Sequence, residues 1–159
     1  MFFEAMHPSW QNMLADQRER LDALEVKLIE RVNAGEKIAP SLENVMRALM
    51  ADPFSVRVLI VGQDPYLTEG HAIGLSFAVS AETKPLPRSL QNIMKELSSD
   101  LPEVSATGRI ERWAERGVLL LNRHLTTSVG EAGAHSKLGW DGFTDAVIRA
   151  LVSRRQPLV

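Results

Sequence analysis

The sequence predicts an α/β sandwich with a parallel sheet, because stretches with helical spacing of apolar residues alternate with short apolar strands. The strands are Val56–Val61 and Val118–Asn122, two nearly continuous aliphatic runs of the kind found in strands that are covered on both faces. The chain has 159 residues, of which 45% are hydrophobic and 24% are charged, and this suits a core of ordinary domain size. We therefore expect residues 1–159 to form a single domain.

Two helices are expected before the first strand. Residues 10–34 are predicted to form an amphipathic helix that stops at Gly35, because leucines recur there at roughly helical spacing: Leu14, Leu21, Leu24 and Leu28. Ser41 is expected to cap a second helix that ends at Asp52-Pro53. The apolar face of this second helix would be Leu42, Val45, Met46 and Leu49.

Three helices are expected after the first strand. Ser89 follows a stiff proline-containing loop and is expected to cap a helix with a buried side made of Leu90, Ile93, Met94 and Leu97. A short helix is predicted from Arg109 to Arg116, closed by Gly117. The last helix follows the second strand and is marked by Phe143, Val147, Ile148 and Leu151.

Composition excludes several classes of protein. The absence of cysteine excludes a disulfide framework and thiolate metal sites, and the four histidines include no pair at metal-ligand spacing, so neither a metal nor a cofactor is expected. No apolar run approaches the ~20 residues that span a bilayer, and the N-terminus does not resemble a signal peptide, so a cytoplasmic protein is predicted. A net charge of −2 means that any contact with nucleic acid requires a local basic patch.

Polar side chains follow the ends of both predicted strands. Gln63, Asp64 and Tyr66 come directly after the first strand, and Asn122 closes the second. Ligands of parallel sheets bind at the carboxyl ends of strands, so these side chains are expected to face one crevice if the strands are neighbours. Each also has a simpler interpretation, because Asp64-Pro65 is a common turn dipeptide and Asn122 can hydrogen bond a nearby turn.

Five blocks of residues occur together in one order. They are Gly62-Gln63-Asp64-Pro65-Tyr66, Gly74-Leu75-Ser76-Phe77, Pro85-Leu86-Pro87-Arg88-Ser89-Leu90, Leu119-Leu120-Leu121-Asn122 with Leu125-Thr126, and Gly139-Trp140 with Phe143-Thr144-Asp145. From about Gly35 to the last residue, the chain thereby resembles family 1 uracil-DNA glycosylase, which excises uracil from DNA. The resemblance implies a three-layer α/β/α sandwich with a central parallel sheet.

The resemblance implies a role for each residue of the crevice. Asp64 would place its negative charge beside the sugar C1′ and position the attacking water. Phe77 would stack on the flipped uracil, Asn122 would hydrogen bond its imide N–H and O4, and Tyr66 would stand against C5, where the methyl group of thymine must fit. Gln63 would help to hold the uracil or the water.

The implied partner is uracil-containing DNA, single- or double-stranded, bound by a monomer. Ser89, at the start of a helix behind Pro85 and Pro87, would contact a phosphate, since backbone donors point outward there. His135 is included among the DNA-binding residues, and Arg88, Arg123, His124 and Lys137 are further candidates for positive charge near the DNA.

The chain departs from the family pattern at three places. Leu67 follows the motif tyrosine, where the family often has a histidine. Arg123-His124 follows the asparagine, where small or aliphatic residues are common. The family's downstream His-Pro-Ser-Pro-Leu-Ser block is not found. The tripeptide His7-Pro8-Ser9 matches the first three residues of that block, but it lies at the N-terminus, before the first predicted helix. Pro157-Leu158-Val159 resembles the start of a third strand, so the expectation is a domain that lacks the family's C-terminal portion and has little or no activity. The alternative function is an inactive remnant that binds DNA or a protein partner.

Overall fold

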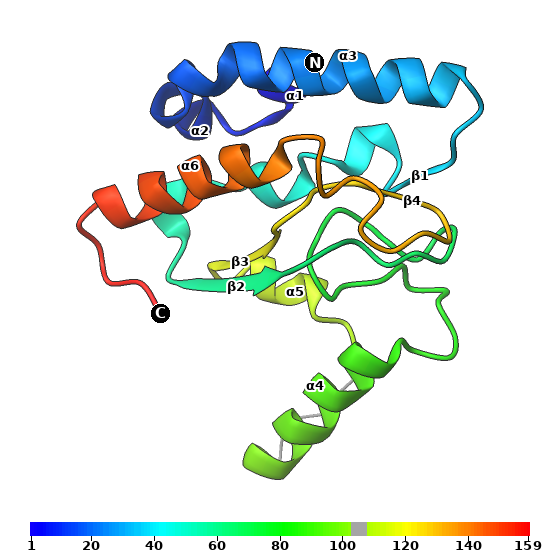
Figure 1. Cartoon of the computed structure of the whole chain (residues 1–159). Coiled ribbons are helices and arrows are strands. Elements are labelled where there is room, and N and C mark those ends of the chain that lie inside the picture. The colour runs from blue at the N-terminus through cyan, green and yellow to red at the C-terminus, as the bar shows by residue number, and fades with distance from the viewer. Residues whose placement is uncertain (103–107) are drawn as a thin grey trace.

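The computed structural model describes residues 1–102 and 108–159, and it confirms the α/β class (Figure 1). Its α-helices are α1 (Phe2–Ala5), α2 (Pro8–Met13), α3 (Arg18–Asn33), α4 (Arg88–Asp100), α5 (Glu111–Ala114) and α6 (Trp140–Ser153). Its strands are β1 (Ile38–Ala39), β2 (Val58–Gly62), β3 (Val118–Asn122) and β4 (Thr127–Ser128). Short 3₁₀ turns are η1 (Ala15–Gln17), η2 (Leu42–Asn44), η3 (Arg47–Leu49) and η4 (Pro53–Ser55).

The two predicted strands pair in parallel, in a register that runs from Val58 opposite Val118 to Gly62 opposite Asn122. The second strand has the predicted bounds. The first begins two residues later than expected, because Val56 is the C-cap of η4, and it ends one residue later, at Gly62. In Figure 1, α3 and α6 lie above this pair and α4 extends below it.

The last residue lies along the free edge of β2. The backbone N–H of Val159 donates to the carbonyl of Arg57 (3.1 Å), and the N–H of Leu59 donates to the carbonyl of Val159 (2.8 Å). This is the hydrogen-bond pattern of a parallel neighbour. A separate antiparallel pair, β1 with β4, ties the region after α3 to the loop after β3.

The prediction of one helix over residues 10–34 is wrong at Leu14. The backbone of Leu14 (φ −117°, ψ 23°) leaves the helical region, and η1 separates α2 from α3. The Leu14 side chain is 1% exposed. Leucine spacing does not detect this break, because Leu14 at the break and the leucines of α3 are buried in the same core.

The second predicted helix is also wrong, since 3₁₀ turns η2 and η3 replace it. Ser41 does not cap a helix. Its hydroxyl donates to the Glu43 carboxylate (3.0 Å) and accepts from the Asn44 amide (2.9 Å), so it is committed to side chains of the following turn.

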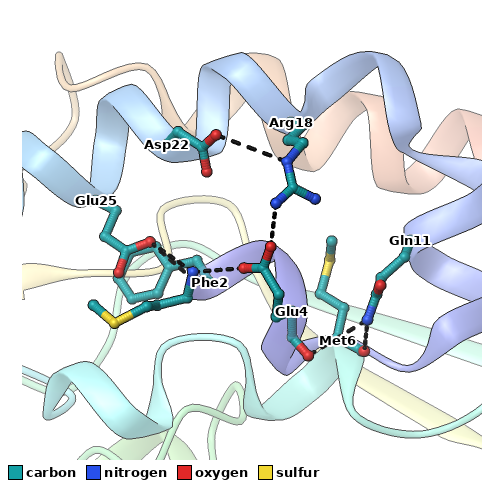
Figure 2. Close-up of polar contacts among 8 residues, drawn as sticks. Phe2, Glu4, Met6, Gln11, Arg18, Asp22 and Glu25 are labelled. Carbon is teal, nitrogen blue, oxygen red and sulfur yellow. Dashed lines mark hydrogen bonds and ion pairs between the residues drawn. The ribbon is translucent and has the colours of Figure 1, made fainter.

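An unpredicted helix, α1, is fixed against α3 by charge and burial (Figure 2). The nearly buried Glu25 carboxylate accepts from the backbone N–H of Phe2 (3.0 Å) and lies 3.5 Å from the N-terminal amino group. Glu4 pairs with both that amino group and Arg18, and the Arg18 guanidinium also covers the Phe3 ring at 4.6 Å. These contacts hold Phe2 and Phe3 in the core, where Phe2 meets Trp140.

The predicted last helix is confirmed as α6, which buries Phe143, Val147 and Leu151. Its first residue, Trp140, anchors a buried polar network. The indole N–H of Trp140 donates to the Thr126 hydroxyl (2.7 Å), which lies 2.8 Å from Nδ1 of His135. Nε2 of His135 lies 2.8 Å from the Glu36 carboxylate, which also accepts from Ser128 and Arg31.

One proton arrangement satisfies this network with a neutral histidine. A carboxylate only accepts, so Nε2 of His135 donates to Glu36, and Nδ1 accepts from the Thr126 hydroxyl. Glu36 follows α3 and His135 precedes α6, so the network joins two distant segments beside β4. It therefore fixes the loop that follows β3.

Glu36 gives this network a pH dependence. The Ser128 hydroxyl, His135 and Arg31 lower the pKa of Glu36 from 4.5 to about 2. A carboxylate whose pKa is lower in the folded chain stabilises the fold above pH ~4.5, and this contribution is lost as pH falls toward 2.

We predict that Glu36→Gln lowers the Tm at pH 7 by roughly 5 °C, because hydrogen bonds to a charged group are replaced by weaker ones. The variant should also lose less stability than the wild type between pH 5 and pH 2, measured by thermal unfolding across that range. Glu69→Gln is the control, because Glu69 forms an exposed pair with Lys37. Equal acid sensitivity of the wild type and Glu36→Gln would contradict this account.

Candidate active site

The crevice predicted from the sequence lies at the carboxyl ends of β2 and β3. The pairing continues past both strands: the N–H of Arg123 donates to the carbonyl of Gly62 (2.8 Å), and that of His124 donates to the carbonyl of Gln63 (2.9 Å). The turn after β2 is therefore held against the segment after β3. One small pocket opens there, lined by Asp64, Pro65, Tyr66, Ala72, Gly74, Leu75, Phe77, Ala78 and Asn122. Gln63 lies on the exposed rim and is not part of this lining.

Phe77 is held in this pocket by a tethered loop. The N–H of Ser76 donates to the carbonyl of Leu120 (3.1 Å), and its hydroxyl donates to the carbonyl of Ile60 (3.3 Å), so the loop is bonded to both strands. Phe77 itself has a φ of 60°, a left-handed conformation that is costly for a bulky residue. Strain of this kind persists only where the surrounding structure imposes it. This backbone conformation places the Phe77 ring in the pocket beside the strand ends.

Asn122 projects into the pocket over Gly62. The residue is 7% exposed, and within the described residues its side-chain amide forms no hydrogen bond to the protein, which leaves its donors and acceptor for a ligand. A Cβ at Gly62 would lie 2.4 Å from Oδ1 of Asn122 and 3.0 Å from Cβ of Ser76. Glycine at the end of β2 thus makes room for the asparagine.

Asp64 has a partner that the sequence analysis did not assign to the site. Nδ1 of His124 lies 2.6 Å from Oδ1 of Asp64, and the two side chains are only 13% and 14% exposed. Strand periodicity gives no signal for this contact, because the chain bends at Arg123 and His124 just after β3.

Ser89 couples the proline loop to the pocket. The prediction that Ser89 caps the helix is wrong: α4 begins at Arg88 with Pro87 at its N-cap, and the Ser89 hydroxyl lies 2.8 Å from the Tyr66 hydroxyl. Tyr66 also donates to the carbonyl of Phe77 (3.2 Å). Burial raises the pKa of the Tyr66 hydroxyl, so the phenol stays neutral at physiological pH.

His135 is poorly placed for the DNA contact expected of it. It is 0% exposed, and its two ring nitrogens lie within hydrogen-bond distance of Thr126 and Glu36. A phosphate cannot reach a side chain that is enclosed and already satisfied on both nitrogens. Its place in the structure is the buried network. Pro85 and Pro87 precede α4, and Ser89, the second residue of α4, contacts Tyr66.

Within residues 1–102 and 108–159, no group of three or more His, Asp or Glu side chains is arranged to hold a metal ion. In the same part of the chain, no helix is both long and apolar enough to cross a membrane.

Comparison with known proteins places these residues in a family context. Residues 50–155, more than half of the chain, match the model of the uracil DNA glycosylase superfamily. The chain is 44% identical to the uracil-DNA glycosylase of Mycobacterium ulcerans over 98% of its own length and 69% of that protein. It is 46% identical to the uracil-DNA glycosylase of Thermobifida fusca, with the same coverage.

The fold is similar to that of a solved relative. The crystal structure of mimivirus uracil-DNA glycosylase matches with a TM-score of 0.85 at 26% identity, and it covers 96% of this chain. The chain in turn spans 59% of the mimivirus chain. The likeness includes the α/β arrangement on which the pocket is built.

A pair of glycines tests how tightly the pocket is packed. Gly70 and Gly74 have nearly the same backbone conformation, with φ of +78° and +79°. A Cβ at Gly74 would lie 1.9 Å from the carbonyl oxygen of Asn44, whereas a Cβ at Gly70 would meet nothing within 4 Å.

We predict that Gly70→Ala costs about 1 kcal/mol of stability through backbone strain alone, and that Gly74→Ala costs at least about 2 kcal/mol more because the loop must move. Urea unfolding of both variants measures the difference. Similar losses in the two variants would mean that the loop before Phe77 is not closely packed.

Proposed function

The chain belongs to the uracil DNA glycosylase superfamily, and we propose that it hydrolyses the N-glycosidic bond of uracil in DNA, leaving an abasic site for base excision repair. The observation that carries the proposal is the convergence of Asp64, Tyr66, Phe77 and Asn122 on one pocket at the ends of two parallel strands. Residues 1–159 contribute to this activity as a single domain.

Asp64 supplies the charge that the reaction needs. As the bond between C1′ and the base nitrogen breaks, positive charge develops on the sugar and negative charge on the departing uracil. An anion held beside C1′ stabilises the sugar cation and orients the water whose oxygen then bonds to C1′. Gln63, next to Asp64 on the rim, helps to hold the uracil or this water.

Asn122 identifies the base. Its side-chain carbonyl accepts from the imide N–H of uracil, and its amide donates to O4. Cytosine presents the reversed pattern at this edge, so its binding would leave buried polar groups unpaired, which rejects an analogue strongly. The lack of a protein hydrogen-bond partner for this amide within the described residues supports the assignment.

Phe77 and Tyr66 complete the pocket. Flipping a nucleotide out of a duplex costs a few kcal/mol, which stacking on Phe77 helps to offset. Tyr66 stands against C5 and excludes the thymine methyl group. Its two hydrogen bonds, to Phe77 and Ser89, hold the phenol in a single position, as steric exclusion requires.

The loop that contains Pro85 and Pro87 is proposed to contact the DNA backbone. It leads into α4, whose first backbone N–H groups point outward and suit a phosphate. Because the Ser89 hydroxyl bonds to Tyr66, a phosphate here would approach beside the pocket wall. The exposed Arg88 adds positive charge to this end of α4. We do not assign a DNA contact to the enclosed His135.

The alternative of a remnant that binds without catalysis is not favoured, because the relatives with 44–46% identity are named as uracil-DNA glycosylases. We propose that the protein acts as a monomer on single- or double-stranded DNA in the cytoplasm, without a metal or cofactor. Size-exclusion chromatography with light scattering tests the oligomeric state, and retained activity in EDTA tests the absence of a metal requirement.

Removal of the charge at position 64 tests the reaction. We predict that Asp64→Asn lowers the rate of uracil release at least about a hundredfold, because the sugar cation loses its counter-charge. Cleavage of a uracil-containing oligonucleotide at abasic sites provides the readout. Asp52→Asn is the matched control, since Asp52 caps η4 and asparagine is also a good cap. Full activity in Asp64→Asn would remove Asp64 from the mechanism.

Two substitutions test base choice. Tyr66→Ala should admit thymine because a steric block is removed, and Asn122→Asp should admit cytosine because the hydrogen-bonding edge is altered. Release of each base from matched oligonucleotides measures the change. Tyr66→Phe is the control that keeps the ring and should still reject thymine. Unchanged selectivity in both test variants would place the pocket elsewhere.

A further inference from the structure

His124 is bonded to the carboxylate on which the proposed reaction depends. Its Nδ1 lies 2.6 Å from Oδ1 of Asp64, and both side chains are mostly enclosed. The contact joins residues 60 positions apart in the sequence. Residues this far apart do not share a local turn, so the tertiary fold brings His124 and Asp64 together.

Backbone pairing beyond the strands explains the contact. The N–H of His124 donates to the carbonyl of Gln63, the residue immediately before Asp64. The chain bends at Arg123 and His124, directly after β3, so that both of their N–H groups face the segment at the end of β2. This bend brings the His124 imidazole to Asp64, on the turn that follows β2.

The direction of the hydrogen bond follows from the partners. An ionised carboxylate only accepts, so Nδ1–H of His124 donates to Oδ1 of Asp64. Among the residues that the structure describes, no other side chain hydrogen bonds the Asp64 carboxylate. Oδ2 is left for a water or substrate, and the rotation of the carboxylate depends on His124.

We propose that His124 is a positioning residue for uracil excision, which orients the Asp64 carboxylate toward the sugar through its Nδ1–H. This inference rests on the proposed function. The same arrangement, in which one member of an Asp–His pair holds the other in its working orientation, is a general device of hydrolytic sites. Only the orientation of the carboxylate is assigned to His124, and the chemistry stays with Asp64.

A competing role for His124 is a contact to a DNA phosphate. The geometry disfavours it, because the side chain is only 13% exposed and its Nδ1 is occupied by Asp64. The two roles differ in what they change. Loss of a phosphate contact weakens DNA binding and raises KM, whereas loss of carboxylate orientation lowers kcat.

Two substitutions distinguish the role of the Nδ1–H donor of His124 from that of its side-chain shape. His124→Leu removes the donor and keeps a branched side chain of similar reach. His124→Asn restores an N–H donor near the position of Nδ1 and cannot become charged. We expect His124→Leu to lower kcat by about 10- to 100-fold on a uracil-containing single-stranded oligonucleotide, with KM within about twofold, since small misplacements of a reacting group have effects of this size. His124→Asn should recover most of the lost kcat.

Unchanged kcat in His124→Leu, or a change confined to KM, would overturn the positioning role while leaving the proposed function intact. Failure of His124→Asn to recover activity would also count against it. If the full-length wild-type protein releases no uracil, the proposed function fails and the positioning role fails with it.

Nitrogen-15 NMR of histidine-labelled full-length protein tests the contact without an activity assay. The expected spectrum has the proton of neutral His124 on Nδ1, and Asp64→Asn should perturb this nitrogen more than those of His135 in its buried network. A proton on Nε2 of neutral His124, or no response to Asp64→Asn, would show that the hydrogen bond is absent.

Discussion

Backbone hydrogen bonds between β2 and β3 bring Asp64 and Asn122, the two central residues of the proposed site, to the same edge of the strand pair. The parallel register pairs Gly62 with Asn122, and two further bonds hold Gln63 and Gly62 to the segment after β3. The turn that bears Asp64 and the amide of Asn122 are thereby brought to the same edge, where ligands of parallel sheets bind. A shift of one residue in this register would turn Asn122 to the other face of the sheet and separate it from the pocket.

The remaining parts of the site are held to this strand pair by specific contacts. Ser76 bonds to both strands and imposes the left-handed backbone of Phe77, and Tyr66 is fixed between Phe77 and Ser89. Behind the pocket, the network of Glu36, His135, Thr126 and Trp140 fixes the loop after β3. Such support is what a reaction sensitive to the placement of one carboxylate requires.

The sequence predicted the parts of the fold that depend on local pattern. The bounds of β3 follow from an aliphatic run that stops at Asn122, and Asp64, Tyr66 and Asn122 were expected to meet because both strands end in polar residues. Features that depend on distant partners were missed. The buried His135 donates a hydrogen bond from Nε2 to the carboxylate of Glu36, which lies 99 residues earlier in the chain. The break at Leu14 leaves the leucine spacing almost unchanged. The contact of His124 with Asp64 depends on pairing beyond the strand ends, which composition and periodicity do not report.

The central claim is that uracil binds at the ends of β2 and β3, and titration of the ¹⁵N-labelled protein with free uracil tests it most directly. The account predicts amide shifts that cluster at residues 62–66, 74–77 and 122, with little response to thymine at equal concentration. A larger cavity lies between β1 and the Lys37–Glu69 pair, and it provides an internal comparison. Shifts confined to that cavity, or equal responses to uracil and thymine, would contradict the account.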